Sequence, residues 1–320
     1  MKRIIAYTLY IAAASASTAV AETIEPIAYG NMNSWEVRNI PESFIIGGNT
    51  KTLYEIAPND TVEGNVPYKS KGGSPWGTSN VLAHVKGITK GSAAVTPDRR
   101  GPNDRAAKLG TVIERVKVVG IINIDVLVGG SIFLGEMIEP VTSTNNPYSN
   151  MAMGVPFTKR PKALQFDYKV NMPAADERVY SSGFGRKKTL PGRDNAEVYI
   201  ILQRRWEDAA GNIYAKRVGT GRERYNKTTS GWVNGHRIDV KYGDITSTPG
   251  YKDYMGLIPE EKSYYARNSK GKMVPVKEVG WDLPDALPTH MLVMASAASG
   301  TAYIGTPGLT LWVDNFALVY

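Results

Sequence analysis

The sequence predicts an all-β protein, a jelly-roll-like sandwich of two facing sheets with long loops and few short helices. Apolar and polar residues alternate with a period of two in several segments, and this alternation places one set of side chains on one face of a strand. The 320 residues also include 32 glycines and 19 prolines. That content suits turns and loops and is high for a helical protein.

Two inner segments carry the alternation most clearly. Residues 122–128 alternate, Gly129-Gly130 should end or bulge the strand, and residues 131–134 resume it. Residues 197–203 and 213–218 are separated by the Gly-containing stretch 208–212, which is typical of a β-hairpin.

The pattern of residues 309–320 predicts a strand that runs to the last residue and lies inside a sheet. Trp312 falls on the less apolar side of this strand, opposite Leu311 and Val313. A short helix is expected at Glu260–Ala266, because Pro259 suits a first turn.

Between the predicted strands lie irregular stretches rich in Gly, Pro, Asn and Ser. Long loops on a rigid sheet are common places for binding surfaces. The longest are residues 65–80, 96–104, 142–155 and 242–275.

The N-terminus is typical of a cleavable signal peptide. Lys2 and Arg3 precede an uncharged run, and Ala19-Val20-Ala21 has the small-x-small form of a cleavage site. We expect cleavage after Ala21, a single large domain over residues 22–320, and a secreted or periplasmic location.

Composition excludes several classes of protein. The chain has no cysteine, which excludes thiol catalysis, Cys-ligated metals and a lipid on a processed N-terminal Cys. Loss of Lys2 and Arg3 would lower the formal charge from +8 to +6, and the basic pairs are dispersed, which argues against nucleic acid as a partner. No later stretch is apolar enough to span a membrane, the nearest being residues 116–134. The sequence does not indicate an oligomeric state.

Several segments spread over the chain carry a family resemblance, among them Gly73-Ser74-Pro75-Trp76-Gly77 and the ending Trp312-Val313-Asp314-Asn315. The others are residues 27–35, 45–54, 78–81, 130–135, 157–170 and 288–290, with Gly305 and Gly308. Together they resemble the putative carbohydrate metabolism domain family of exported Bacteroidetes proteins. The resemblance implies a jelly-roll sandwich associated with glycan use. It implies neither an established reaction nor a set of catalytic residues.

Two departures from related sandwiches concern binding. Asn31-Met32-Asn33-Ser34 stands where an acidic pair often precedes the Trp, and Ala295–Ala298 replaces a more Ser-rich stretch. In such sandwiches calcium is held by oxygen ligands that join the first and last strands, and here Asn31, Asp314 and Asn315 could offer three. The alternative is a turn-stabilising role for Asp314.

Sugar binding requires flat aromatic rings together with polar groups that bind hydroxyls. The loops offer both, and the predicted ligand-binding residues are Trp76, Ser79, Asn80, Trp232, Asn234 and Trp281, with further rings from Tyr148, Tyr251, Tyr254, Tyr264 and Tyr265. For any single Trp the alternative is a place in the core or a loop-anchoring role. Trp35 and Trp206 are expected to be structural.

No motif predicts catalytic residues. His84, His236 and His290 lack metal-ligand spacing, and the serine-hydrolase elbow and phosphate-binding loops are absent. The leading hypothesis is therefore an exported, non-catalytic protein whose partner is a glycan or polysaccharide. One alternative is a glycoside hydrolase with a carboxylate pair drawn from Glu197, Glu207, Asp208, Asp239 and Asp244. Another is a surface adhesin or structural subunit that pairs through a strand edge.

Overall fold

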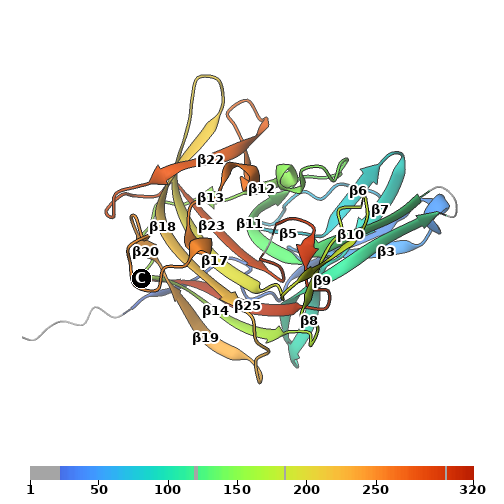
Figure 1. Cartoon of the computed structure of the whole chain (residues 1–320), viewed down its shortest axis with the longest axis horizontal. Helices are drawn as coiled ribbons and strands as arrows, with labels where there is room; N and C mark the ends of the chain where they lie inside the picture. The colour runs from blue at the N-terminus through green and yellow to red at the C-terminus, as the bar shows by residue number, and fades with distance from the viewer. Residues whose placement is uncertain (1–21, 119–121, 184, 300) are drawn as a thin grey trace, which may run out of the picture.

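The structure, a computed structural model, describes residues 22–118, 122–183, 185–299 and 301–320, and the predicted signal peptide lies outside them (Figure 1). It confirms the all-β prediction, because the described residues form strands and only four short 3-10 helices, η1 to η4. No helix among them has the length and apolar character needed to cross a membrane.

The C-terminal strand is an interior strand of a seven-stranded sheet, as the sequence predicts. It lies antiparallel between two neighbours, so that Leu311 faces Leu109 on one side and Val170 on the other. The order is β10-β9-β25-β14-β19, with β1 paired to β25 and β8 to β9. The strands are β1 (Ile24–Pro26), β8 (Val95–Gly101), β9 (Asp104–Val118), β10 (Ile122–Gly129), β14 (Ala163–Asn171), β19 (Val233–Asp239) and β25 (Thr310–Val319).

The predicted hairpin is confirmed as the antiparallel pair β17–β18 of a ten-stranded sheet. The order is β13-β23-β17-β18-β22-β21-β12-β11-β5, with β20 paired to β18 and an additional pairing of β23 with β11. The strands are β5 (Trp76–Thr78), β11 (Ser131–Met137), β12 (Met151–Met153), β13 (Val155–Pro156), β17 (Ala196–Glu207), β18 (Ile213–Tyr225), β20 (Lys241–Tyr242), β21 (Tyr265–Arg267), β22 (Met273–Trp281) and β23 (His290–Ser296).

Three small sheets flank the two large ones. We call two of them, β3-β2-β4 and β6-β7, the wing; β3, β6 and β7 lie on the right of Figure 1. Their strands are β2 (Trp35–Pro41), β3 (Thr50–Ile56) and β4 (Asp60–Glu63); β6 (Val81–Val85) and β7 (Ile88–Ser92); and β15 (Glu177–Tyr180), β16 (Lys188–Pro191) and β24 (Ile304–Gly305). The 3-10 helices are η1 (Phe44–Ile46), η2 (Pro147–Asn150), η3 (Asp253–Met255) and η4 (Glu260–Lys262).

The prediction of a helix at Glu260–Ala266 is wrong beyond the first turn. Only Glu260–Lys262 is helical, and Tyr265–Arg267 forms β21. The backbone of β21 pairs with β22 and meets β12 at Tyr265, so the sheet and not a helix satisfies its polar groups.

The main core lies between the two large sheets. On β17, Val198, Ile200 and Leu202 are fully buried in it, together with Leu311 and Val313 of β25. Because side chains alternate along a strand, the residues between them face the other side of the ten-stranded sheet.

Gly130 marks the point where the chain passes from the seven-stranded to the ten-stranded sheet, between β10 and β11. A Cβ there would lie 2.3 Å from the Ala94 carbonyl oxygen and 2.7 Å from the Gly110 amide nitrogen. Only glycine permits this close backbone approach, and the predicted break at Gly129-Gly130 is confirmed.

Candidate functional site

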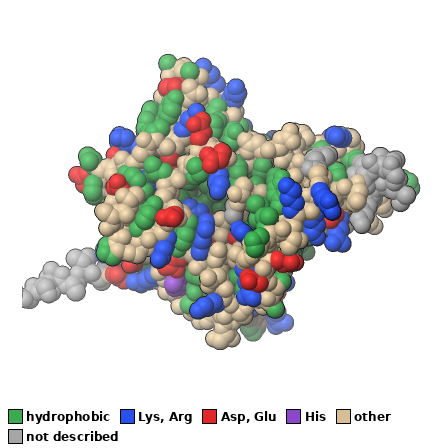
Figure 2. Space-filling model, in the orientation of Figure 1, with side chains coloured by type: hydrophobic (Ala, Val, Ile, Leu, Met, Phe, Trp, Pro, Cys, Tyr) green, Lys and Arg blue, Asp and Glu red, His purple; other side chains and the backbone are tan. Residues whose placement is uncertain are grey.

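The outer face of the ten-stranded sheet forms the floor of a cavity of about 1120 Å³. The strands β11, β23, β17 and β18 cross the middle of the molecule (Figure 1), and Figure 2 shows this face hollowed near its centre. Its walls include the loops that carry η2 and η3, residue 299, residues 301–304, and side chains of β6, β7, β9 and β10.

Two rows of side chains cross the floor. In one row, strand pairing places Tyr199 of β17 between Met294 of β23 and Arg222 of β18. In the next row it places Glu197 between Ser296 and Arg224, and Ser131 of β11 extends that row. The pairing of neighbouring strands thus brings four distant segments of the chain together, and all seven residues line the cavity.

Glu197, Arg222 and Arg224 form an ionic group that we call the floor cluster. Arg222 donates to both oxygens of Glu197, with Nη2 2.7 Å from Oε1 and Nε 3.1 Å from Oε2. Arg224 Nε donates to Oε2 at 2.6 Å, and its Nη2 donates to the Ser299 carbonyl at 2.9 Å. One carboxylate is therefore shared by two guanidinium groups.

Tyrosine rings supply the aromatic surface of the cavity. Tyr199 donates a hydrogen bond to the Tyr264 hydroxyl at 2.8 Å, and the Tyr264 ring packs edge-on against Tyr148. The Arg224 guanidinium lies 4.5 Å from the centre of the Tyr254 ring. The cavity-lining tyrosines are Tyr148, Tyr199, Tyr254, Tyr264 and Tyr303.

Burial raises the pKa of each of these phenols, to about 12 for Tyr264 and Tyr303. They are therefore neutral near pH 7 and can both donate and accept hydrogen bonds. A general base, in contrast, would need a pKa near the working pH.

Three carboxylates line the cavity within the described part of the chain: Glu114, Glu197 and Asp253. Glu197 is held by the two arginines, and Glu114 accepts from Lys51 at 3.3 Å. Asp253 is exposed on η3. Both Glu197 oxygens therefore accept hydrogen bonds from arginine.

Trp76 and Asn80, two of the predicted ligand-binding residues, do not line this cavity. Trp76 is fully buried, its Nε1 donates to the Ala28 carbonyl at 2.8 Å, and its ring packs 5.2 Å from that of Phe316. Asn80 is also fully buried and bonds backbone groups, among them the Val95 amide and carbonyl at 2.8–2.9 Å. Segments distant in sequence cover both side chains.

Ser79 is the predicted ligand-binding residue that does line the cavity. Its Oγ accepts a hydrogen bond from the Ser131 amide at 2.9 Å, and its own amide donates to the Ser131 carbonyl at 2.8 Å. These bonds fix it at the end of the second floor row.

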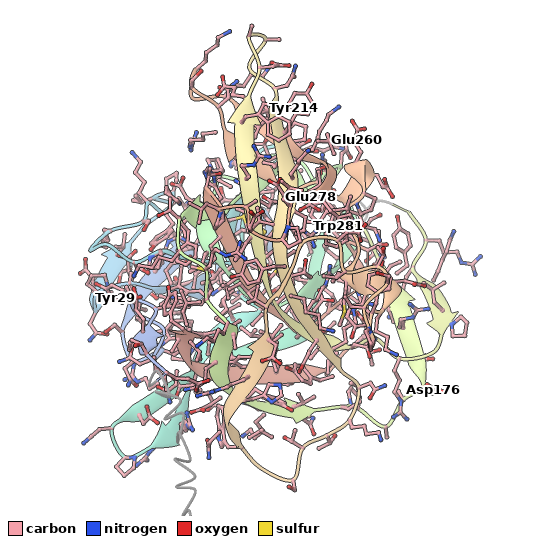
Figure 3. The ribbon with its side chains drawn as sticks, turned by 90° about the vertical axis from the view of Figure 1, so that its left-hand side faces the viewer. Tyr29, Asp176, Tyr214, Glu260, Glu278 and Trp281 are labelled. Carbon is pink, nitrogen blue, oxygen red and sulfur yellow. The ribbon has the colours of Figure 1, made fainter. Side chains whose placement is uncertain are left out.

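Trp232, Asn234 and Trp281 lie away from the cavity lining. Trp232 and Asn234 flank the start of β19 in the other sheet, where Arg100 lies 4.3 Å from the Trp232 ring centre and donates to Asn234 Oδ1 at 2.6 Å. Trp281 ends β22 near Glu278 (Figure 3), and Arg217 lies 5.5 Å from its ring centre. The three predicted Trp residues therefore do not converge on one groove.

Of the three residues considered for calcium, Asp314 is held in an ion pair with Arg100. Arg100 Nη1 lies 2.6 Å from Asp314 and 2.7 Å from Asp167, and Asn315 donates to Asp167 at 2.8 Å. Asn31 is exposed. The described residues contain no group of three or more His, Cys, Asp or Glu that could hold a metal ion, and a guanidinium supplies the positive charge here.

The other carboxylates considered for hydrolysis serve turns or lie in solvent. Glu207 accepts from Ser269, Asp208 from Asn212, and Asp244 from Thr246, and Asp239 is exposed.

The structural role expected for Trp35 is confirmed, because this side chain is buried and donates to the Met32 carbonyl. Trp206 also has a structural role, because it pairs with Tyr214 across the hairpin. Trp206 is 42% exposed and stacks on Tyr214 at the tip of the projecting hairpin (Figure 3).

Sequence reasoning missed Tyr199, Arg222, Arg224 and Tyr303. A signal for one of them was present, because Glu197 and Tyr199 are two residues apart in the predicted strand 197–203 and so share one of its faces. Arg222 and Arg224 lie beyond the predicted return strand 213–218, in the part of β18 that only the structure reveals. The additional rings named from the sequence, Tyr148, Tyr254 and Tyr264, do line the cavity.

The comparisons with solved structures concern two crystal structures described as putative glycoside hydrolases. The one from Bacteroides thetaiotaomicron VPI-5482 has 14% identity and a TM-score of 0.45, with 85% of this chain and 75% of that chain covered. The one from Bacteroides vulgatus ATCC 8482 has 16% identity and a TM-score of 0.46, with 87% and 98% covered. No match was found among curated proteins.

The family comparison agrees with the resemblance seen in the sequence. The model of the putative carbohydrate metabolism domain matches residues 47–242, well over half of the chain. The matched range includes Glu197, Tyr199, Arg222 and Arg224 of the cavity floor, and the chain belongs to the putative carbohydrate metabolism domain family.

Proposed function

We propose that this protein is an exported, non-catalytic glycan-binding protein whose ligand occupies the cavity on the ten-stranded sheet. The observation that carries the proposal is the floor itself, in which tyrosine, serine and charged side chains from four paired strands line one cavity. A sheet is a rigid support, so these groups are already positioned before the ligand arrives.

The chemistry of the lining suits a saccharide. Tyrosine offers a flat ring for the apolar face of a pyranose and a hydroxyl for its polar edge, and Ser131 and Ser296 add hydroxyl groups. A volume of about 1120 Å³ exceeds the usual range for one small ligand, about 300–1,000 Å³. An oligosaccharide of a few rings fits that size.

The arrangement of Glu197 supports the non-catalytic part of the proposal. General acid–base catalysis needs a carboxyl group within hydrogen-bond reach of the substrate proton. Both Glu197 oxygens instead accept from arginine. The hydrolase alternative would have to use Glu114 or Asp253, the other carboxylates that line the cavity in the described residues.

Export is the part of the proposal that rests on sequence. The basic, apolar and small-x-small succession of residues 1–21 and the absence of cysteine support a secreted or periplasmic mature chain. Cell fractionation with N-terminal sequencing tests it, and an N-terminus at Glu22 in the exported fraction is expected. A mature protein that retains Met1 in the cytoplasm would contradict it.

Glycan-array binding, with a reducing-sugar assay on the same ligands, tests the function. We expect binding without sugar release and a loss of affinity of up to about tenfold in Tyr254→Ala, which removes a ring from the cavity. Tyr214→Ala, on the hairpin tip outside the cavity lining, is the matched control. Sugar release that Glu114→Gln or Asp253→Asn abolishes would establish the hydrolase alternative, and concentration-dependent fibres would favour a structural subunit.

A further inference from the structure

We propose that the cavity selects an acidic saccharide, one that carries a carboxylate or a sulfate ester, and binds that anion at the floor cluster. This inference rests on the proposed function and deepens it. It follows from the positive charge that remains in the floor cluster, where two arginines share one glutamate.

The cavity lining as a whole is positive. Within the part of the chain that the structure describes, five basic and three acidic side chains line it: Lys86, Lys90, Arg222, Arg224 and Lys262 against Glu114, Glu197 and Asp253. A concave surface with one sign of charge concentrates ligands of the opposite sign.

The floor cluster concentrates this surplus at one place. Two guanidinium groups share the single carboxylate of Glu197, and their side chains are only 15% and 26% exposed. Arginine does not lose its proton in proteins. A partly desolvated positive charge therefore remains, and a counter-anion would stabilise it.

Donors remain for that anion. Among the described residues, neither Arg222 nor Arg224 makes a hydrogen bond through Nη1 to a protein group. The guanidinium groups also lie against aromatic rings, Arg222 at 5.0 Å from the Tyr199 centre and Arg224 at 4.5 Å from the Tyr254 centre. Rings and Glu197 together fix the planes of the two forks, which suits the planar or tetrahedral oxygens of a carboxylate or sulfate.

The arginine buried on β18 outside the cavity has no such surplus. Arg217, also buried, donates to both oxygens of Glu278 at 2.7 and 2.5 Å, one carboxylate for one guanidinium. That pair lines no part of the cavity.

A panel of matched oligosaccharides tests the inference. Each uronate or sulfated oligosaccharide is paired with its carboxyl-reduced or desulfated counterpart, and binding to the full mature chain is measured by calorimetry at low and high sodium chloride. We expect the acidic member of at least one pair to bind about tenfold or more tightly, with the preference reduced by salt. The uronate and sulfate arms distinguish the two sources of the anion.

Two outcomes separate this inference from the proposed function. Neutral members that bind as tightly as their acidic partners would overturn the acidic specificity and leave glycan binding in place. No binding by any member would overturn both.

Two variants that each remove one charge, with opposite expected effects, make the test specific to the cluster. Arg224→Gln should lower affinity for the acidic ligand about tenfold, whereas Glu197→Gln should raise it, since the internal competitor for both guanidinium groups is lost. Arg237→Gln, an exposed arginine of β19 outside the cavity lining, removes the same charge elsewhere and is the control. Circular dichroism checks that each variant folds, and a fall in acidic-ligand affinity in Glu197→Gln equal to that in Arg224→Gln would contradict the assignment.

Discussion

Two buried ionic triads in this molecule have opposite stoichiometry. In the floor cluster, two arginines share one glutamate. In the wing, Arg38 of β2 is shared by Glu55 of β3 and Glu139, with contacts of 2.8 and 2.5 Å. We call this second group the wing cluster; it has an excess of negative charge where the floor cluster has an excess of positive charge.

The two clusters also differ in access to solvent. The Arg38, Glu55 and Glu139 side chains are 0–2% exposed, whereas Arg222 and Arg224 open to the cavity. A surplus carboxylate can be neutralised by taking up a proton, but a surplus guanidinium cannot lose its own. The wing cluster can therefore be self-contained, and the floor cluster needs an anion from outside.

The largest expected effect is the loss of the central cation of the wing cluster. Arg38→Met leaves the buried carboxyl groups of Glu55 and Glu139 without a cationic partner, and we expect the free energy of unfolding at pH 7 to fall by about 3–5 kcal/mol. Urea denaturation measures it. Arg115→Met removes an arginine that is 60% exposed and should change stability by less than about 0.5 kcal/mol. Equal losses of stability in the two variants would contradict the expectation that burial of the arginine determines the loss.

The pH dependence of stability sharpens the comparison. Burial, with a further contribution from nearby Glu139, raises the pKa of Glu55 from 4.5 to about 8. Between these values the folded state holds a proton that the unfolded state releases, so stability should fall as pH rises, by at most about 1.4 kcal/mol per pH unit from this group.

The variant Glu55→Gln removes that proton and should flatten the dependence between pH 5 and 8, in denaturation curves recorded across that range. The control Glu261→Gln changes an exposed carboxylate and should keep the slope of the parent protein. A slope that survives in Glu55→Gln would show that another group titrates.

The sequence predicted the strands of the fold better than the contents of the site, and the reason is physical. Alternation at 197–203 and 309–320 is local, because successive side chains of any strand point to opposite faces. It identified β17, its hairpin partner and the interior C-terminal strand. Which strands become neighbours is decided by contacts distant in sequence, and so the four-strand floor could not be predicted.

The tryptophan predictions failed for the same reason, because contacts distant in sequence decide which side chains are buried. Trp76 lies in a Gly-, Ser- and Pro-rich segment that is typical of an exposed loop, yet Ala28 and Phe316 cover it. The composition of this segment is typical of a loop, but the burial of Trp76 depends on residues 48 and 240 positions away in the sequence. Glu197 was named as a candidate carboxylate, and its two arginine partners were not, because they lie on the returning strand β18.

A smaller effect is expected in the floor cluster. Glu197→Gln should lower the free energy of unfolding by about 1–2 kcal/mol, less than Arg38→Met, because water and ions can reach the two arginines from the cavity. Added sodium sulfate should recover more stability in this variant than in the parent protein, since sulfate can replace the lost carboxylate. Thermal melts with and without sulfate measure this, and a loss as large as that of Arg38→Met without recovery would remove the distinction between the clusters.

The smallest change in stability is expected for an exposed ion pair, which serves as the reference for both clusters. Lys159 and Glu25 form an ion pair at 2.6 Å, as short as the contacts within the clusters, but their side chains are 56% and 46% exposed. Water solvates both charges in the folded and unfolded states, so the pair gains little on folding. Lys159→Met should therefore change the free energy of unfolding by less than about 1 kcal/mol, in the same urea titration as Arg38→Met. A larger loss would mean that short ion-pair geometry, and not burial of unequal numbers of charges, sets the energetics of both clusters, and the argument for an anionic ligand would then lose its physical basis.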